Sequence, residues 1–213
     1  MEPVYVIGVG MTPFSRHPDL SVRDLATRAV RAALEDAGLG PEDIGAIAFA
    51  NAVQGAMEGQ FGIRGQVALR DLPFDAVPIV NVENACASAT TALHLAITQV
   101  RAGQAEIALA VGAEKMVSPD SALSMAAFEG SWDRADRDNV IARLRRLGLG
   151  TPTPARKAAR ETPHTVFMDV YAAFAKFHMA RYGTTQRQLA VVAAKNHTHS
   201  IHNPLQENLE RLD

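Results

Sequence analysis

Short, continuously apolar runs alternate with helical patterns along the first half of this chain, and this alternation narrows the possible folds more than any other feature. The four runs span residues 4–10, 44–53, 77–82 and 105–111. The helices expected between them span residues 21–37, 62–69 and 85–100. Runs of this length that are apolar throughout are typical of strands buried on both faces. The sequence therefore predicts an α/β fold with a mixed, mostly parallel sheet covered by helices.

The composition of the chain changes after Ser118. Charged residues cluster between Trp132 and Arg160, and the prolines of "TPTPARKAARETP" (151–163) favour a loop there. Two more helices are expected, over residues 167–181 and 185–200. We therefore predict two parts, an α/β domain over residues 1–117 and a helical and loop subdomain over residues 118–213.

Length and charge limit the class of protein. The chain has 213 residues, of which 47% are hydrophobic, and this is enough apolar material to bury a core. Its net charge of -2 provides no overall attraction to nucleic acids or anionic membranes. The sequence contains no apolar run of the ~20 residues that a membrane span needs, and no secretory signal pattern at its start. We therefore expect a cytoplasmic protein without a nucleic-acid partner or a membrane span.

Cys86 is the only cysteine, which excludes an internal disulfide and a CxxC metal or redox motif. It lies among small residues, where an apolar strand gives way to a helix. Free cysteines are often buried for packing alone, and composition by itself favours that interpretation. The helix N-terminus favours a nucleophile, because its unpaired N–H groups stabilise a thiolate and the oxygen of an attacked thioester. Both interpretations fit the residues.

The face of this helix that carries Cys86 is expected to be buried. At ~100° per residue, Thr90, Leu93 and Ile97 lie near that face. His94 lies about 80° round the helix from Cys86, so we expect it to pack beside the cysteine rather than to act as its base.

Other patterns that suggest ligand sites are weak. His197, His199 and His202 form an HxHxxH pattern, but the first two point about 200° apart on a helix, so we expect no metal site. The segment Gly8–Gly10 lacks the third glycine of a dinucleotide fingerprint, so we expect no nucleotide cofactor. The arginines between residues 134 and 160 form either a solvated surface, which is the usual case, or a site for phosphate groups.

Four segments carry a resemblance to a known family. They are "VYVIGVGMTPFSR" (4–16), "NVENACASATTALHLA" (81–96), "ALAVGAEKMVS" (108–118) and "FHMARYGTTQRQLAVVAAKNHTHSIHNP" (177–204). In motif and order they resemble the thiolase superfamily, and most closely its SCP2-type thiolases and thiolase-like lipid-transfer proteins. The resemblance covers essentially the whole chain.

This resemblance implies a fold and a reaction. Thiolases consist of two similar α/β halves with a loop domain inserted in the first, and this chain resembles the first half. Cys86 matches the cysteine that takes an acyl group from a 3-ketoacyl-CoA or acetyl-CoA and passes it to CoA or a carbanion. Met116 is then expected near the acyl pocket, and Tyr171 and Phe174 along the acyl or pantetheine channel. Coenzyme A thioesters are the implied substrates, and no cofactor is implied.

The resemblance also implies a missing C-terminal half. The second half of a thiolase supplies a histidine that activates the nucleophile and a second cysteine that acts as acid and base, whereas this chain has one cysteine. Three explanations are open: a fragment of a longer thiolase, a subunit whose second half is a separate chain, or a degenerate protein that only binds acyl-CoA. A homodimer formed across a sheet edge is implied as well.

Three functions follow from these expectations. The first is a thiolase-type acyl-CoA acyltransferase, similar to acetyl-CoA acetyltransferase or 3-ketoacyl-CoA thiolase, that works as a fragment or subunit with Cys86 acylated. The second is a thiolase-like aldolase or lyase of steroid or lipid side-chain degradation, whose relatives work with a small acyl-CoA-binding partner protein. The third is a non-catalytic module that binds acyl-CoA or lipid. The nucleophile motif around Cys86 favours the first.

Overall fold

The computed structural model describes residues 3–151 and 166–206. The chain divides into two compact units, Met1–Ser131 and Trp132–Asp213, and each is described by itself. The predicted boundary at 117/118 falls inside the first unit, in the loop between β3 (Ala108–Gly112) and α5 (Ser121–Ala126). The first unit therefore includes α5 and the 3-10 turn that follows it.

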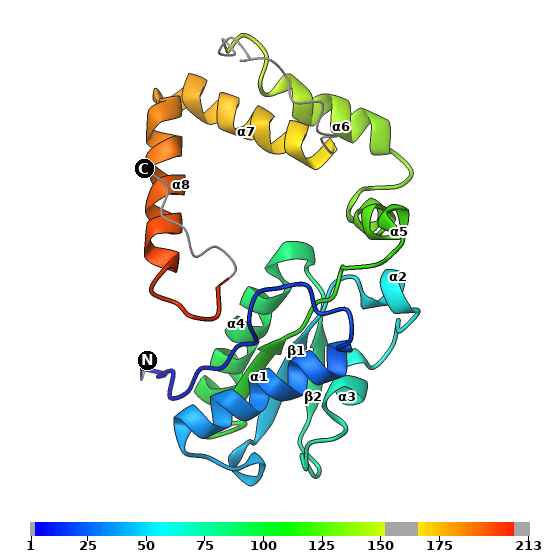
Figure 1. Cartoon of the computed structure of the whole chain (residues 1–213), viewed down its shortest axis with the longest axis vertical. Coiled ribbons are helices and arrows are strands. Elements are labelled where there is room, and N and C mark those ends of the chain that lie inside the picture. The colour runs from blue at the N-terminus through cyan, green and yellow to red at the C-terminus, as the bar shows by residue number, and fades with distance from the viewer. Residues whose placement is uncertain (1–2, 152–165, 207–213) are drawn as a thin grey trace. The chain divides into compact units, whose positions relative to one another are not determined.

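The first unit is built on a three-stranded sheet in which both pairings are parallel (Figure 1). β1 (Ala46–Ala50) lies in the centre, between β2 (Ile79–Val82) and β3. Every residue of β1 is buried, because helices cover both faces of the strand and a neighbour pairs with each edge. The predicted α/β fold is confirmed, and so are the strands predicted at 44–53, 77–82 and 105–111.

Helix α1 (Val22–Ala37) begins at a capping box. The Ser21 Oγ accepts a hydrogen bond from the Asp24 N–H, and the Asp24 carboxylate accepts one from the Ser21 N–H. Hydrogen bonds from the Ser21 hydroxyl and the Ser21 N–H hold the pKa of Asp24 below its ordinary value. The helix ends at Gly38, whose φ of 68° is the left-handed conformation that glycine adopts most easily.

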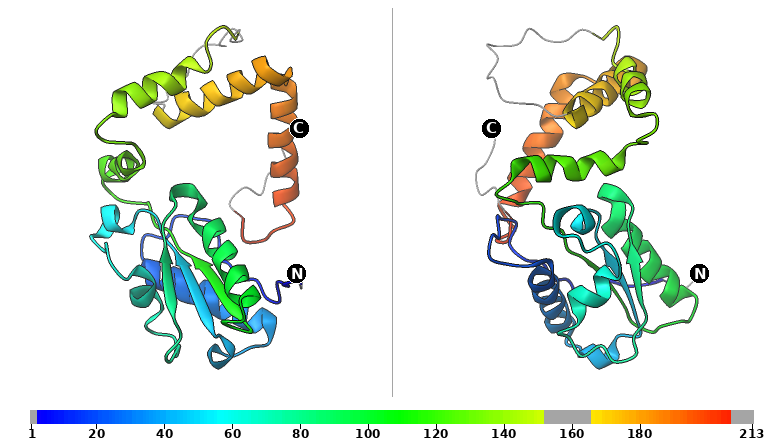
Figure 2. Two further views of the ribbon diagram at one scale, coloured as in Figure 1. Left: turned by 180° about the vertical axis from the view of Figure 1, so that it is seen from behind. Right: turned by 90° about the vertical axis from the view of Figure 1, so that its right-hand side faces the viewer.

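Helices cover both faces of the sheet (Figure 2). On one face, α1 and α3 (Arg64–Leu69) form the main core around Phe49 of β1, which is fully buried. On the other face, α4 (Ser88–Arg101) packs on Ala48 and Ala50 of the same strand. The alternation of side chains along β1 thus divides the core into two layers.

The buried face of α4 differs from the prediction. Ala92 and Ala96 are buried, whereas Leu93 is 45% exposed and Ile97 is only partly buried. Small side chains let the helix approach the alanines of β1 closely, so the larger residues lie beside the open edge of the sheet. The predicted buried stripe through Thr90, Leu93 and Ile97 is therefore wrong.

The strand predicted at 4–10 is also wrong, because this segment is a loop that pairs with no strand of the described chain. It lies against α1 instead. A Cβ atom on Gly10 would be 2.2 Å from the carbonyl oxygen of Ala29. The Val9 N–H donates a hydrogen bond of 2.8 Å to the Asp36 carboxylate. Apolar composition alone does not make a strand when no neighbouring strand accepts its hydrogen bonds.

Gly10→Ala is expected to lower the free energy of unfolding by about 1–3 kcal/mol, because the added methyl group overlaps the α1 backbone. Urea denaturation followed by circular dichroism measures the change. Gly62→Ala is the matched control, since no atom lies within 4 Å of the Cβ position there. Equal stability of the two variants would mean that the N-terminal segment does not pack on α1 in solution.

The described part of the second unit is helical, with α6 (Arg137–Arg146), α7 (Val166–Tyr182) and α8 (Gln186–Ser200). α6 packs on α7, and Trp132 stacks on Phe167 with 4.7 Å between the ring centroids. The helices predicted at 167–181 and 185–200 are confirmed.

Sequence reasoning missed the short helices α2 (Gln54–Glu58) and α5, as well as α6. α6 occupies part of the stretch for which the sequence predicts only a charged cluster, and its buried Ile141 explains why a helix forms there. Nearly all of the loop predicted at 151–163 lies outside the described residues. None of the described helices is both long and apolar enough to cross a membrane.

Candidate active site

Cys86 lies at the carboxyl end of β2, where the chain turns from the sheet into α4. It is part of a separate 3-10 turn, η2 (Ala85–Ala87), and not of the first turn of α4 as the sequence predicts. Its side chain is exposed, so it does not pack in the core of this chain. The carboxyl ends of parallel strands are where open α/β sheets bind their ligands.

The backbone before Cys86 is strained. Ala85 has a φ of 46°, which is the left-handed region that residues other than glycine rarely adopt. Ser88, only 6% exposed, holds this turn from the α4 side: its Oγ accepts a hydrogen bond from the Asn84 N–H at 2.8 Å and donates one to the Ala85 carbonyl at 2.7 Å. The Glu83 carboxylate accepts the Ala85 N–H at 2.7 Å. Cys86 therefore lies at the apex of a turn that is fixed by hydrogen bonds.

A second pair of polar side chains extends this support. The Asn84 Nδ2 donates to the Thr91 Oγ1 at 3.0 Å, and the Thr91 hydroxyl donates to the Ala87 carbonyl at 2.9 Å. No hydrogen bond within the described residues uses the N–H of Cys86 itself. An exposed thiol beside an uncommitted N–H can take part in attack on a carbonyl and hold the resulting oxyanion.

His94, the histidine nearest to Cys86 in the sequence, lies apart from the cysteine. His94 is exposed on α4, about 12 Å further along the helix axis than Cys86 at 1.5 Å per residue. Its predicted packing role is wrong because its side chain faces solvent. His197, His199 and His202 follow one another on and after α8, and the described residues contain no group of three His, Cys, Asp or Glu side chains that could hold a metal ion.

A buried polar cluster around Asn51 lies at the carboxyl ends of β1 and β3, and sequence reasoning missed it. Asn51 is 3% exposed, and its Nδ2 donates to the Ala113 carbonyl and to the Glu114 carboxylate, both at 2.8 Å. Its Oδ1 accepts hydrogen bonds from the Gln54 N–H and from Arg64. The cluster joins the loop after β1 to the loop after β3 and so shapes this edge of the sheet.

Asn51→Ala is expected to lower the free energy of unfolding by about 1–3 kcal/mol, because it leaves the buried partners of the amide without hydrogen bonds. Thermal and urea unfolding measure the loss. Gln104→Ala removes an exposed amide of the same first unit and should leave stability nearly unchanged. A loss for Asn51→Ala no larger than that of the control would contradict a structural role for the cluster.

The other predicted site residues are divided between the two units. Met116 follows β3, so it lies on the same edge of the sheet as Cys86, and its carbonyl accepts a hydrogen bond from Ser124 Oγ at 2.7 Å. Tyr171 and Phe174 lie on α7 in the second unit, with their rings edge to face and their centroids 6.1 Å apart. The structure brings these two aromatic residues together, and their predicted contact with the acyl or pantetheine group stays a prediction.

Part of the predicted basic cluster is neutralised within the second unit. Arg145 of α6 forms an ion pair of 2.7 Å with Asp169 of α7. Arg137 pairs with its neighbour Asp138 at 3.2 Å. Arg134, Arg143 and Arg146 also belong to the described residues, and the basic residues at 156, 157 and 160 lie outside them. A role for the arginines in binding phosphate therefore stays a prediction.

Comparison with known families matches residues 4–211 to the family described as thiolase, N-terminal domain. An acetyl-CoA acetyltransferase of Methanothermobacter thermautotrophicus is 32% identical over 207 residues, which are 96% of this chain and 46% of that protein. Sterol carrier protein 2 of Gallus gallus is 34% identical over 203 residues, which are 94% of this chain and 33% of that protein. This chain thus spans about half the length of these relatives, or less.

A solved structure described as Ltp2-ChsH2(DUF35) aldolase resembles this chain with a TM-score of 0.56 and 26% sequence identity. The likeness covers 93% of this chain and 44% of that chain. It therefore supports the predicted fold along nearly the whole sequence.

Proposed function

We propose, from the premise that this chain belongs to the thiolase family through its N-terminal domain, that it is the nucleophile-bearing half of a coenzyme A thioester acyltransferase. One observation carries the proposal. The only cysteine is exposed at the apex of a strained, hydrogen-bonded turn at the carboxyl edge of a parallel sheet. A cysteine that serves only for packing needs neither exposure nor a fixed turn.

In the proposed reaction the Cys86 thiolate attacks the carbonyl carbon of an acyl-CoA thioester. With acetyl-CoA, the bond from Sγ to the acyl carbon forms, the bond from that carbon to the CoA sulfur breaks, and CoA leaves as a thiol once its sulfur is protonated. With acetoacetyl-CoA, the thiolate attacks the 3-keto carbon instead, the bond between C2 and C3 breaks, and C2 takes a proton so that acetyl-CoA leaves. The uncommitted N–H of Cys86 supports the negative oxygen of the intermediate. A second acceptor, either CoA or a carbanion, then takes the acyl group and restores the thiolate.

Among the described residues no hydrogen bond joins the Cys86 thiol to a base, so we infer that a proton acceptor comes from elsewhere. We assign that role to the second half of the enzyme, which is the part of the relatives' chains that this chain does not match. By resemblance, that half supplies a histidine and a second cysteine. Met116 then lines the acyl pocket, and Tyr171 and Phe174 line the channel for the acyl or pantetheine chain. Acetyl-CoA and 3-ketoacyl-CoA esters are the proposed substrates, and the proposal requires no metal or cofactor.

Turnover of a completed enzyme tests this proposal. The test uses a fusion protein, called the single-chain fusion here. It joins this chain to the part of the Methanothermobacter relative that this chain does not match. We expect the fusion to cleave acetoacetyl-CoA only when free CoA is supplied, and to form two molecules of acetyl-CoA. Binding of acyl-CoA without any cleavage would contradict the proposed acyltransferase and favour the non-catalytic lipid- or acyl-CoA-binding module.

An aldolase or lyase is the second candidate, because the structural likeness to the Ltp2-ChsH2(DUF35) aldolase covers 93% of this chain. Such an enzyme breaks a carbon–carbon bond without consuming CoA, and it is proposed to need a small partner protein. Cleavage of a 3-hydroxyacyl-CoA side chain in the absence of free CoA would establish this alternative. The homodimer that the resemblance implies and the cytoplasmic location expected from the sequence belong to both candidates and do not separate them.

A further inference from the structure

Ser88 is the first residue of α4, and its side chain is enclosed. It is 6% exposed, whereas serines in folded proteins are mostly exposed. Ala92 and Ala96 follow it at intervals of four residues and are also buried, so the three share the face of the helix that packs on the sheet. A hydroxyl group in such a position needs hydrogen-bond partners within the protein, because water hardly reaches it.

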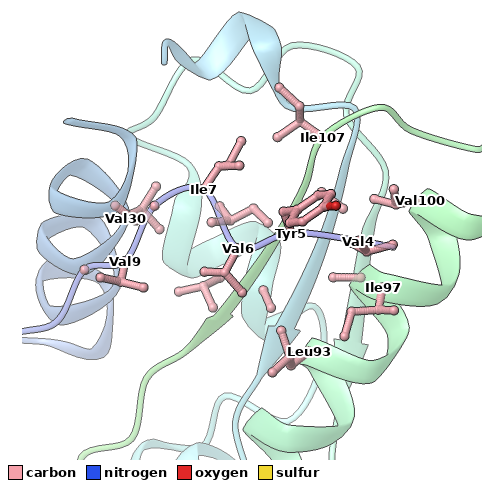
Figure 3. Close-up of a pocket in the computed structure, with 18 of the residues that line it drawn as sticks. Val4, Tyr5, Val6, Ile7, Val9, Val30, Leu93, Ile97, Val100 and Ile107 are labelled. Carbon is pink, nitrogen blue, oxygen red and sulfur yellow. The ribbon is translucent and has the colours of Figure 1, made fainter. Parts of the chain in front are cut away.

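The large apolar residues of α4 lie elsewhere on the helix. Leu93, Ile97 and Val100 line an apolar groove of about 690 Å³ at the outer edge of β3 (Figure 3). Neither Ser88 nor Cys86 lines this groove. The surroundings of Ser88 are therefore separate from the groove, and they consist of α4, the sheet and the turn that precedes the helix.

The Ser88 hydroxyl does not cap its own helix. A serine at the start of a helix usually accepts a hydrogen bond from an N–H of the first turn. In α4 the N-cap is Ala87, and no side chain caps the helix. The Ser88 Oγ instead accepts the Asn84 N–H at 2.8 Å and donates to the Ala85 carbonyl at 2.7 Å. Both hydrogen bonds therefore serve the turn that carries Cys86.

The residue held by these two bonds is the strained one. Ala85 has a φ of 46°, and in this region the Cβ of an alanine lies too close to the following carbonyl oxygen. Such a conformation persists only when the surrounding structure enforces it. The Glu83 carboxylate also binds the Ala85 N–H, but Glu83 is exposed, whereas Ser88 is buried. Without the hydroxyl, Ala85 would be free to return to an ordinary φ, and Cys86 would turn with it.

We propose that Ser88 is a positioning residue for acyl transfer, because its hydroxyl keeps Ala85 left-handed and thereby fixes the Sγ and the N–H of Cys86 toward the acyl carbon. This inference rests on the proposed function and deepens it, since Ser88 acts through Cys86 without touching the substrate. A misplacement of about 1 Å in a reacting group can cost about a hundredfold in rate. Binding of the CoA part of the substrate does not depend on the turn, so the effect should fall on kcat and not on KM.

Steady-state kinetics of the single-chain fusion with Ser88→Ala test the role. We expect kcat for CoA-dependent cleavage of acetoacetyl-CoA to fall by about ten- to a hundredfold, with KM within a few-fold of the wild type. The assay is run well below the melting temperature of the variant. Thr98→Val is the control, because it removes another α4 hydroxyl that donates to a carbonyl, that of His94 at 2.8 Å. Its kcat should stay within a few-fold of the wild type.

Substitutions of Ala85 separate positioning from a general effect on stability. Glycine adopts a positive φ readily, so adding Ala85→Gly to Ser88→Ala should raise kcat about fivefold or more over Ser88→Ala alone. Ala85→Val adds a β-branched side chain that disfavours a positive φ. Because Ala85 is exposed, this variant should stay folded and still lose kcat while the Ser88 hydroxyl is present. It therefore tests the proposal even where Ser88→Ala fails to fold.

NMR of the chain alone tests the support of the turn without any turnover. The three-bond coupling constants of Ala85 report its φ, and in the wild type they should fit the positive value. In Ser88→Ala they should move to values typical of a negative φ, and in Thr98→Val they should not move.

Four results would overturn the proposal. They are a kcat of Ser88→Ala as high as that of Thr98→Val, a rise in KM at unchanged kcat, unchanged coupling constants of Ala85 in Ser88→Ala, and wild-type turnover of Ala85→Val. A wild-type fusion that does not cleave acetoacetyl-CoA would instead reject the proposed function. The coupling constants of Ala85 would then still decide whether Ser88 holds the turn, so the two failures are distinguishable.

Discussion

Cys86→Ala is expected to lower the turnover of the single-chain fusion by about a thousandfold or more, because it removes the atom that carries the acyl group between the two steps. The side chain is exposed, so the substitution should leave the fold and the melting temperature unchanged. The measurement is the kcat for CoA-dependent cleavage of acetoacetyl-CoA, with the melting temperature recorded beside it.

His94→Gln is the matched control for this prediction. His94 is the histidine nearest to Cys86 in sequence, but it is exposed and lies further along α4. We expect kcat to stay within a few-fold of the wild type, as for other exposed residues outside the site. Full turnover of Cys86→Ala would reject the cysteine as nucleophile, and a large loss in His94→Gln would identify a base within this chain.

Phe49→Ala is expected to lower the free energy of unfolding by about 3–5 kcal/mol, because it leaves a cavity in the centre of the main core. Phe49 is 0% exposed in β1, and Gly65 of α3 lies so close that a Cβ atom there would be 2.6 Å from the Cβ of Phe49. Urea denaturation followed by circular dichroism measures the loss of stability. A variant that is already partly unfolded without urea would also agree with a loss of this size.

Phe61→Ala is the control for the loss of a phenyl ring, since Phe61 is 75% exposed in the same unit. Its free energy of unfolding should change by no more than about 0.5 kcal/mol. A Phe49→Ala loss as small as this would mean that the packing of α3 on β1 does not stabilise the first unit.

Much of the fold could be predicted from hydrophobic pattern alone. The strands β1, β2 and β3 and the helices α1, α4, α7 and α8 correspond to predicted elements, because their apolar residues follow strand or helix spacing. The pattern fails at residues 4–10, where apolar composition is as strong as in β1. Strand formation also requires a neighbour, and the sequence does not say which elements lie side by side.

The environment of Cys86 could be predicted only in outline. Its place between a strand and a helix follows from the pattern, but the separate turn η2 and the positive φ of Ala85 depend on hydrogen bonds from Ser88 and Glu83. The cluster around Asn51 was missed because Asn51 and Glu114 are 63 residues apart in the sequence. Only the folded sheet places the ends of β1 and β3 together.

The mass of the intact protein after incubation with acetyl-CoA tests the central claim most directly, since it detects the acyl-enzyme itself. The single-chain fusion should gain the mass of one acetyl group, and the Cys86→Ser fusion should gain none. Peptide mapping should place the group on the segment that contains residue 86. The absence of an adduct on a fusion that binds acetyl-CoA, or an adduct that persists in Cys86→Ser, would contradict the assignment of Cys86 as the acylated nucleophile.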